Sequence, residues 1–216
     1  MPPKIKNIIF DLGGVILDID ETLICNELKK LDLDGSQLVQ SEAFQSLDER
    51  FERGIISAAT FRKQAKKLLN RPNMSDSNID DIWNSVLLDI PRERIHALEE
   101  IKKHYNIFLM SNTNEIHYDL YVRDLQLRFG YKQFDDLFNK SYFSFDVHLL
   151  KPDPLFFEYI LDHQNLKPNE TLFIDDTKAN IEVAKKIGLH TYNIRREELV
   201  RNLFVNGVLR PDVALD

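Results

Sequence analysis

The chain has 216 residues, of which 43% are hydrophobic and 29% charged, a composition typical of an ordinary globular protein. Its net charge of −7, without a basic stripe, argues against nucleic acid as a partner. The single cysteine, Cys25, excludes an intramolecular disulfide framework and favours a reducing compartment. No signal-like segment precedes the first predicted strand and no apolar run could span a bilayer, so we expect a cytoplasmic protein without a membrane partner.

The first predicted element is an apolar strand that ends at Asp11. Gly13 and Gly14 follow it and indicate a sharp turn, and residues 15–17 are expected to form a short second strand. In a parallel α/β sheet, ligands bind at the carboxyl ends of the strands. A carboxylate at this position is therefore well placed for chemistry.

From about residue 18 to residue 88 the apolar spacing is helical, and no strand is predicted. The clearest helices follow Ser57 and Ser75, which are expected to cap them, and a looser helical pattern lies between Leu38 and Phe51. A stretch of about 70 residues is long enough for a subdomain. We therefore expect residues 18–90 to form a helical bundle that is inserted after the first strand.

Strands and helices alternate after Pro91, which is expected at the first position of a helix. Further strands are predicted at residues 106–110, 142–145, 171–174 and 190–194. Between them, the apolar spacing predicts helices at residues 115–129, 154–161 and 181–187. Such alternation predicts an α/β fold, in which residues 1–17 and 91–216 form a core with a parallel sheet flanked by helices.

Polar side chains stand where three of the predicted strands end, and a lysine lies between the last two of these positions in sequence. The set consists of Asp11, Ser111 with Asn112, Lys151, and Asp175 with Asp176. The carboxyl ends of parallel strands share one edge of a sheet, so we expect the strand-end residues to lie close together. A carboxylate can act as a nucleophile, Mg²⁺ prefers carboxylate and phosphate oxygens, and a lysine neutralises phosphate charge. The set therefore predicts phosphoryl transfer.

Four segments in this order resemble the four motifs of the haloacid dehalogenase (HAD) superfamily of aspartate-nucleophile hydrolases. They are Asp11–Val15, Phe108–Asn112, Leu150–Asp153 and Phe173–Thr177. The insert, residues 18–90, is similar to the C1-type helical cap of that family. Ser111–Asn114 and Phe51–Ser57 further resemble the subgroup that holds sugar-1-phosphate phosphatases and the phosphatase lobe of soluble epoxide hydrolase. The resemblance implies a Rossmann-like core, Mg²⁺ as the cofactor and a small phosphomonoester, such as a sugar phosphate, as the substrate.

The resemblance also implies a role for each matching residue. Asp11 is the expected nucleophile, and Lys151 is expected to balance charge on Asp11 and on the phosphate. Ser111 and Asn112, together with Lys151, are expected to hold the phosphate group. The expected metal ligands are Asp11, Gly13 through its backbone carbonyl, Asp175 and Asp176. Two further candidates for substrate contact, which could equally be solvated helix residues, are Arg50 and Arg53.

One position departs from the family pattern. Phosphatases of this superfamily usually carry a second aspartate two positions after the nucleophile, as general acid and base, and this chain has Gly13 there. Such a group is typically worth about 10²–10⁴-fold in rate. One account is a substrate with a good leaving group, such as the anomeric oxygen of a sugar 1-phosphate or an acyl phosphate. The other account is a substitute acid, for which the candidates are Asp18, Asp20, Glu21, His117 and His148.

The missing aspartate leaves two rival functions open. A 2-haloacid dehalogenase also uses an aspartate nucleophile without the second aspartate, and it needs no metal. The adjacent Asp175 and Asp176 argue against this rival, because two neighbouring carboxylates repel each other unless a cation is near. The second rival is a phosphate-binding protein that has lost turnover.

Overall fold

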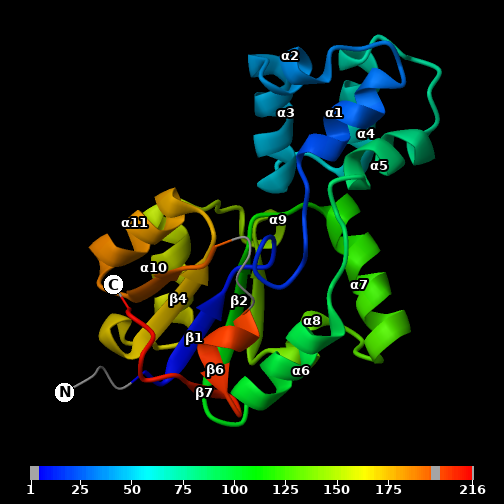
Figure 1. The fold of residues 1–216 in the computed structure, drawn as a ribbon. Coiled ribbons are helices and arrows are strands. Elements are labelled where there is room, and N and C mark those ends of the chain that lie inside the picture. Colours follow the sequence, from blue (N-terminus) through cyan, green and yellow to red (C-terminus); the bar gives the residue numbers. More distant parts are fainter. Residues whose placement is uncertain (1–4, 196–199, 216) are drawn as a thin grey trace.

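The computed structural model describes residues 5–195 and 200–215, and its centre is a five-stranded sheet (Figure 1). The strands are β1 (Asn7–Phe10), β2 (Asn106–Ser111), β3 (Lys140–Phe143), β4 (Thr171–Asp175) and β5 (His190–Asn193). Their order is β3-β2-β1-β4-β5, and every neighbouring pair runs parallel. All five carboxyl ends therefore lie along one edge, and the predicted α/β class is confirmed.

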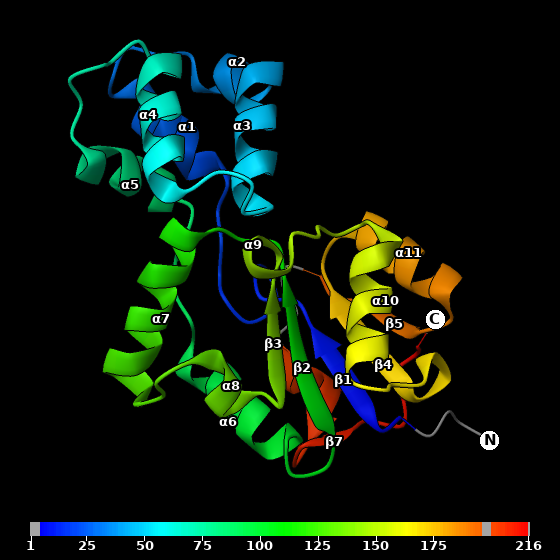
Figure 2. The ribbon, with the colours of Figure 1, turned by 180° about the vertical axis from the view of Figure 1, so that it is seen from behind.

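Helices cover both faces of the sheet, because successive strand residues point to opposite sides. In β1, Ile8 and Phe10 belong to one hydrophobic cluster and Ile9 to another. Residues of α6, α7 and α8 complete the first cluster, and residues of α10 and α11 complete the second, so the two groups lie on opposite faces (Figures 1 and 2). The bounds of the core helices are α6 (Arg92–Ile101), α7 (Glu115–Phe129), α8 (Phe134–Leu137), α9 (Ser144–Val147), α10 (Pro154–His163) and α11 (Lys178–Ile187).

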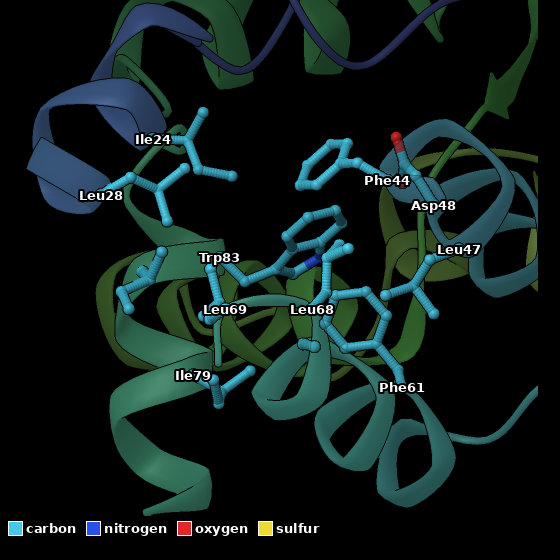
Figure 3. A pocket seen from close by; sticks show the side chains of 12 residues that line it. Ile24, Leu28, Phe44, Leu47, Asp48, Phe61, Leu68, Leu69, Ile79 and Trp83 are labelled. Atoms are coloured by element: carbon cyan, nitrogen blue, oxygen red, sulfur yellow. The ribbon is translucent and has the colours of Figure 1, made fainter. Parts of the chain in front are cut away.

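The insert between β1 and α6 is helical, as predicted. Its helices are α1 (Thr22–Lys29), α2 (Gly35–Val39), α3 (Glu42–Glu52), α4 (Ala58–Leu68) and α5 (Asp76–Asn84). Ser41, Ser57 and Ser75 each cap a helix by accepting a hydrogen bond from a backbone N–H three residues on. The helices enclose an apolar cluster of their own, in which Trp83 packs against Phe61 (Figure 3). Figures 1 and 2 show this bundle beyond the carboxyl ends of the strands.

Two chain segments connect the insert to the core, and they pair with each other. The backbone hydrogen bonds between them run from Asp18 to Asp89, from Leu88 to Asp18 and from Asp20 to Val86. Together the segments form a short antiparallel ribbon above the carboxyl edge of the sheet.

Residues 15–17 differ from the prediction, because they form a tight turn instead of a strand. The N–H groups of Ile16 and Leu17 both donate to the Leu12 carbonyl, which closes the turn directly after Asp11. Pro91 occupies the N-cap of α6, one residue before its predicted place.

Short elements account for the remaining differences from the prediction. β3 begins and ends two residues before the strand predicted at 142–145, and the residues after it start α9. The hairpin of β6 (Phe204–Val205) and β7 (Val208–Leu209) carries no clear pattern in the sequence.

Within the described part of the chain, none of the helices combines the length and apolar character needed to cross a membrane.

Candidate active site

Lys151 lies between two strand-end carboxylates at the carboxyl edge of the sheet. Asp11 follows β1, Asp175 ends β4, and Lys151 belongs to the loop between α9 and α10. Lys151 Nζ lies 2.7 Å from Asp11 Oδ1 and 2.8 Å from Asp175 Oδ2. The side chains of Lys151 and Asp175 are 2% and 0% exposed. Because a buried charge is costly unless it is paired, the two aspartates fix the place of this ammonium group.

Burial and opposite charge act against each other on these groups. Burial raises the pKa of Asp11 to about 7, although Lys151 opposes this shift. Burial also disfavours the charged form of Lys151, yet Asp11 and Asp175 hold the pKa of Lys151 above its usual value. Lys151 is therefore cationic at neutral pH. A divalent cation beside Asp11 would further favour its ionised form.

The carboxylate of Asp175 uses both of its oxygens within the protein. Oδ2 accepts hydrogen bonds from Lys151 Nζ at 2.8 Å and from Asn180 Nδ2 at 2.9 Å. Oδ1 accepts a hydrogen bond from the backbone N–H of Thr177 at 2.7 Å. These contacts fix the orientation of Asp175, which suits it to orient Lys151 more than to bind a metal directly.

Three carboxylates offer oxygen ligands at one place. One oxygen each of Asp11, Asp175 and Asp176 lies within 4.8 Å of the others, and Asp176 is exposed while the other two are buried. Gly14 makes room for Asp176: its φ is +71°, and a Cβ there would lie 2.8 Å from Asp176 Cγ. Hard carboxylate oxygens fit Mg²⁺, which usually takes one or two carboxylates together with water and phosphate.

The backbone next to Asp11 offers a further oxygen. Among the residues described, the carbonyl of Gly13 accepts no backbone hydrogen bond, because the turn uses the carbonyls of Leu12 and Leu17 instead. A Cβ on Gly13 would lie 3.2 Å from Ile19 Cδ1. The predicted carbonyl ligand is therefore available, and the position itself has no side chain that could transfer a proton.

Asn112 holds the backbone of Lys151. Its Nδ2 donates to the Lys151 carbonyl at 2.9 Å, and its Oδ1 accepts from the Lys151 N–H at 2.8 Å. The next residue, Thr113, exchanges two hydrogen bonds with the Ser144 hydroxyl at the start of α9. Ser111 is buried at the end of β2. Since the Asn112 amide is engaged with Lys151, any contact of Asn112 with phosphate is left to its backbone N–H.

Two of the acids suggested as substitutes at Gly13 have other partners. Asp18 forms an ion pair with Arg94, whose Nη2 lies 2.7 Å from Asp18 Oδ1. Asp20 accepts hydrogen bonds from the backbone N–H and the hydroxyl of Thr22, at the start of α1. Both carboxylates therefore have a local structural role.

The two suggested histidines are likewise engaged. His117 stacks on Trp83, and burial lowers the pKa of His117 to about 4, so its ring is neutral at pH 7. His148 Nδ1 donates to the carbonyl of Arg53 at 2.7 Å, which joins the core loop to the insert. The fifth candidate, Glu21, is exposed at the N-cap of α1.

The two arginines predicted in the insert contact other residues of the insert. Arg50 Nη1 donates to Gln64 Oε1 at 3.4 Å, and Arg53 Nε lies 3.0 Å from Glu49 Oε1. Both guanidinium groups are therefore engaged within the insert, and their contact with substrate stays a prediction.

The sequence pattern did not single out Glu52, the last residue of α3. Burial and the nearby Asp48 raise the pKa of Glu52 to about 8, and Lys151 opposes this shift. Glu52 also contributes to the raised pKa of Tyr121, whose hydroxyl donates to Thr113. Asp48 and Glu52 are four residues apart on one helix and so share a face. This spacing is the sequence signal that could have identified Glu52.

The sequence pattern of the haloacid dehalogenase-like hydrolases matches residues 5–188 of this chain. That range contains the sheet edge with its carboxylates and lysine, and the whole insert. The chain therefore belongs to the haloacid dehalogenase-like hydrolase family, as the four motifs predicted.

Two of the matches, one by sequence and one by structure, come from Bacteroides thetaiotaomicron. Its D-ribitol-5-phosphate phosphatase is 31% identical over 193 residues, which cover 87% of this chain and 91% of that protein. A HAD family enzyme from this organism, solved as a complex with magnesium and inorganic phosphate, matches with a TM-score of 0.80 at 32% identity. The match covers 93% of this chain and 100% of that one.

The likeness to dehalogenases is more distant. The L-2-haloacid dehalogenase of Xanthobacter autotrophicus matches with a TM-score of 0.57 at 17% identity, over 87% of this chain and 76% of that one. An identity this low indicates a shared fold and carries no argument for a shared reaction.

Proposed function

We propose that this protein is a Mg²⁺-dependent phosphatase that hydrolyses a small phosphomonoester through an aspartyl-phosphate on Asp11. One observation carries the proposal: the buried ammonium group of Lys151 pairs with Asp11 and Asp175. These two carboxylates and that of Asp176 cluster at the ends of parallel strands. The similar D-ribitol-5-phosphate phosphatase and the magnesium and phosphate complex of a similar enzyme support it.

Each residue of the cluster has a proposed part in the reaction. Asp11 attacks phosphorus while the alcohol leaves, and water then hydrolyses the phosphoaspartate. Lys151, 2.7 Å from Asp11 Oδ1, neutralises charge on the nucleophile and the phosphoryl oxygens. Bound Mg²⁺ would supply further charge neutralisation at the phosphoryl group. The residues proposed to hold it are Asp11, Asp176 and the Gly13 carbonyl, with Asp175 orienting the site.

The proposed substrate is a sugar or polyol phosphate. The polyol phosphatase from Bacteroides thetaiotaomicron, which spans most of this chain, supports this class. Ser111 and the backbone of Asn112 would hold the phosphate group, since both lie at the end of β2 beside Lys151. A role of Arg50 or Arg53 in binding the rest of the substrate would require these side chains to leave Gln64 and Glu49.

We also propose a division of labour within the chain. Residues 1–17 and 91–216 would form the catalytic core, and residues 18–90 a cap that covers the substrate. A cap that closes over the strand ends excludes bulk water during phosphoryl transfer and then admits the water that releases phosphate.

We further propose that the protein is cytoplasmic, because its single cysteine fits a reducing compartment.

Phosphate release from a panel of phosphorylated metabolites, measured with Mg²⁺ and again with a chelator, tests the proposal. We expect release that depends on Mg²⁺ and is concentrated on sugar or polyol phosphates. Turnover of a 2-haloacid in the presence of chelator would instead establish the dehalogenase. Binding of a phosphate mimic without turnover of any ester would identify a binding protein.

A further inference from the structure

The proposed reaction needs a proton for the departing alcohol, and Gly13 stands where the family carries its general acid. We propose that Glu52 of the insert is the catalytic residue that protonates the leaving oxygen. This inference rests on the proposed phosphatase function and adds the missing acid to it.

The end of α3 is anchored on α9 and on the loop after it, which carries Lys151. Gly54, with φ +62°, lies so close to α9 that a Cβ would stand 3.0 Å from the Phe145 carbonyl carbon. His148 of the same loop donates its Nδ1–H to the Arg53 carbonyl at 2.7 Å. Figures 1 and 2 show this end of α3 facing α9 and the carboxyl edge of the sheet. Glu52 is therefore held over the strand ends by contacts on its carboxyl-terminal side.

The Glu52 carboxyl group lies close enough to the core to interact electrostatically with Lys151 and with Tyr121. These two residues bond to Asn112 and to Thr113, just after β2. Arg53, the neighbouring cation, pairs with Glu49 instead. Among the residues described, no hydrogen bond to the Glu52 carboxyl is found, whereas four of the five other candidate groups are engaged elsewhere.

The surroundings of Glu52 keep it protonated at neutral pH. Burial is the largest cause, and the carboxyl groups of Asp48, Glu21 and Glu49 act in the same direction, so its pKa rises to about 8 despite Lys151. Asp48 itself lies beside Phe44 at the rim of the apolar interior of the insert (Figure 3). A carboxylic acid whose pKa lies near the working pH is an effective general acid.

As an Asp11 oxygen forms its bond to phosphorus and the bond from phosphorus to the alcohol oxygen breaks, Glu52 gives its proton to that oxygen. The Glu52 carboxylate then takes a proton from the water that attacks the phosphoaspartate, which releases inorganic phosphate and regenerates Asp11. The acid is thus carried by the insert, so the insert must lie over the core for the first step to occur.

The test measures alcohol release in a single turnover, with enzyme in excess, for wild type and E52Q in the presence of Mg²⁺. D-ribitol 5-phosphate provides a poor leaving group, and 4-nitrophenyl phosphate provides a good one that needs little protonation. We expect E52Q to slow release from the ribitol ester by about 10²–10³-fold and from the aryl ester by less than about 10-fold. The rate of release from the ribitol ester by wild type should also fall above about pH 8. The rate of E52Q should show no such fall.

E42Q is the matched control, because Glu42 is exposed in the first turn of α3 and should show wild-type rates. Mg²⁺-dependent binding of inorganic phosphate, followed by thermal shift, checks that the E52Q site is intact. The role of Glu52 would be overturned if E52Q slowed release from both esters equally, did not slow it at all, or no longer bound phosphate. An active wild type would still be a phosphatase in each of these cases. A wild type that releases phosphate from neither ester, nor from any member of the metabolite panel, would overturn both proposals.

Discussion

Asn112 and Lys151 are joined by two reciprocal hydrogen bonds, from side-chain amide to backbone carbonyl and from backbone N–H to side-chain oxygen. The pair connects the end of β2 to the loop after α9, two segments that are 39 residues apart in sequence. A residue that the motif assigns to phosphate therefore also holds the backbone from which the Lys151 side chain extends.

Replacing Asn112 by alanine should remove both of these bonds and lower kcat by about 10-fold or more, because small displacements of a catalytic group are costly. The free energy of unfolding should fall by about 1–3 kcal/mol. Asn139→Ala is a suitable control, since Asn139 also bonds a backbone N–H, that of Ile107, at the opposite end of the sheet. The control should lose stability and keep its kcat. Equal kcat losses in both variants would contradict a specific role for Asn112.

Asp11→Asn should lower the rate of phosphate release by about 10⁴-fold or more, because an amide is a poor nucleophile. The fold should persist, since Lys151 keeps its ion pair with Asp175. Steady-state phosphate release and circular dichroism together check this expectation. Asp162→Asn, at an exposed position of α10, should behave as wild type. Retained turnover in the Asp11 variant would contradict the assignment of Asp11 as the nucleophile.

Gly14→Ala should raise the Mg²⁺ concentration needed for half-maximal phosphate release by about 10-fold or more, because the new methyl group collides with Asp176. Gly130→Ala separates this collision from backbone strain. Gly130 also has a positive φ, +79°, yet a Cβ there would have no neighbour within 4 Å. Both variants should lose about 1 kcal/mol or more of stability, and only the first should need more Mg²⁺. An unchanged Mg²⁺ requirement in Gly14→Ala would argue against Asp176 as a ligand.

His117 should make the protein sensitive to acid. Burial lowers its pKa to about 4 in the folded state, from an ordinary value of 6.5, so only the unfolded chain binds a proton between these values. Stability from this group is therefore complete above about pH 6.5 and declines as the pH falls towards 4, by about 3 kcal/mol in all. Denaturant unfolding of wild type and His117→Gln at several pH values measures the decline. If the free energy of unfolding falls equally with pH in the two proteins, another group causes the decline.

The sequence predicted the strand ends well because buried parallel strands are continuous apolar runs, and such runs end abruptly at Asp11 and Asp175. It also predicted the caps at Ser57 and Ser75, because capping depends on local chemistry. The segment 15–17 has the composition of a strand, but the tertiary need for a reversal after Asp11 overrides that preference.

Side-chain partners were the part that the sequence could not provide. Asn112 is engaged by a backbone 39 residues away, and His117 is neutralised by burial against Trp83 of the insert. Glu52 acquires its high pKa from burial and from other residues of the insert. Each of these properties arises from contacts between distant segments, which apolar periodicity and motif spacing do not record.

The ribbon that joins the insert to the core restricts how the two parts can separate. Its two segments are linked by hydrogen bonds at Asp18, Asp20 and Leu88, so neither can swing alone without losing them. The proposed opening of the cap would therefore bend both segments together, as one hinge with a preferred axis. Glu52, the proposed proton donor, would then return along the same path at every closure, and so to a reproducible position.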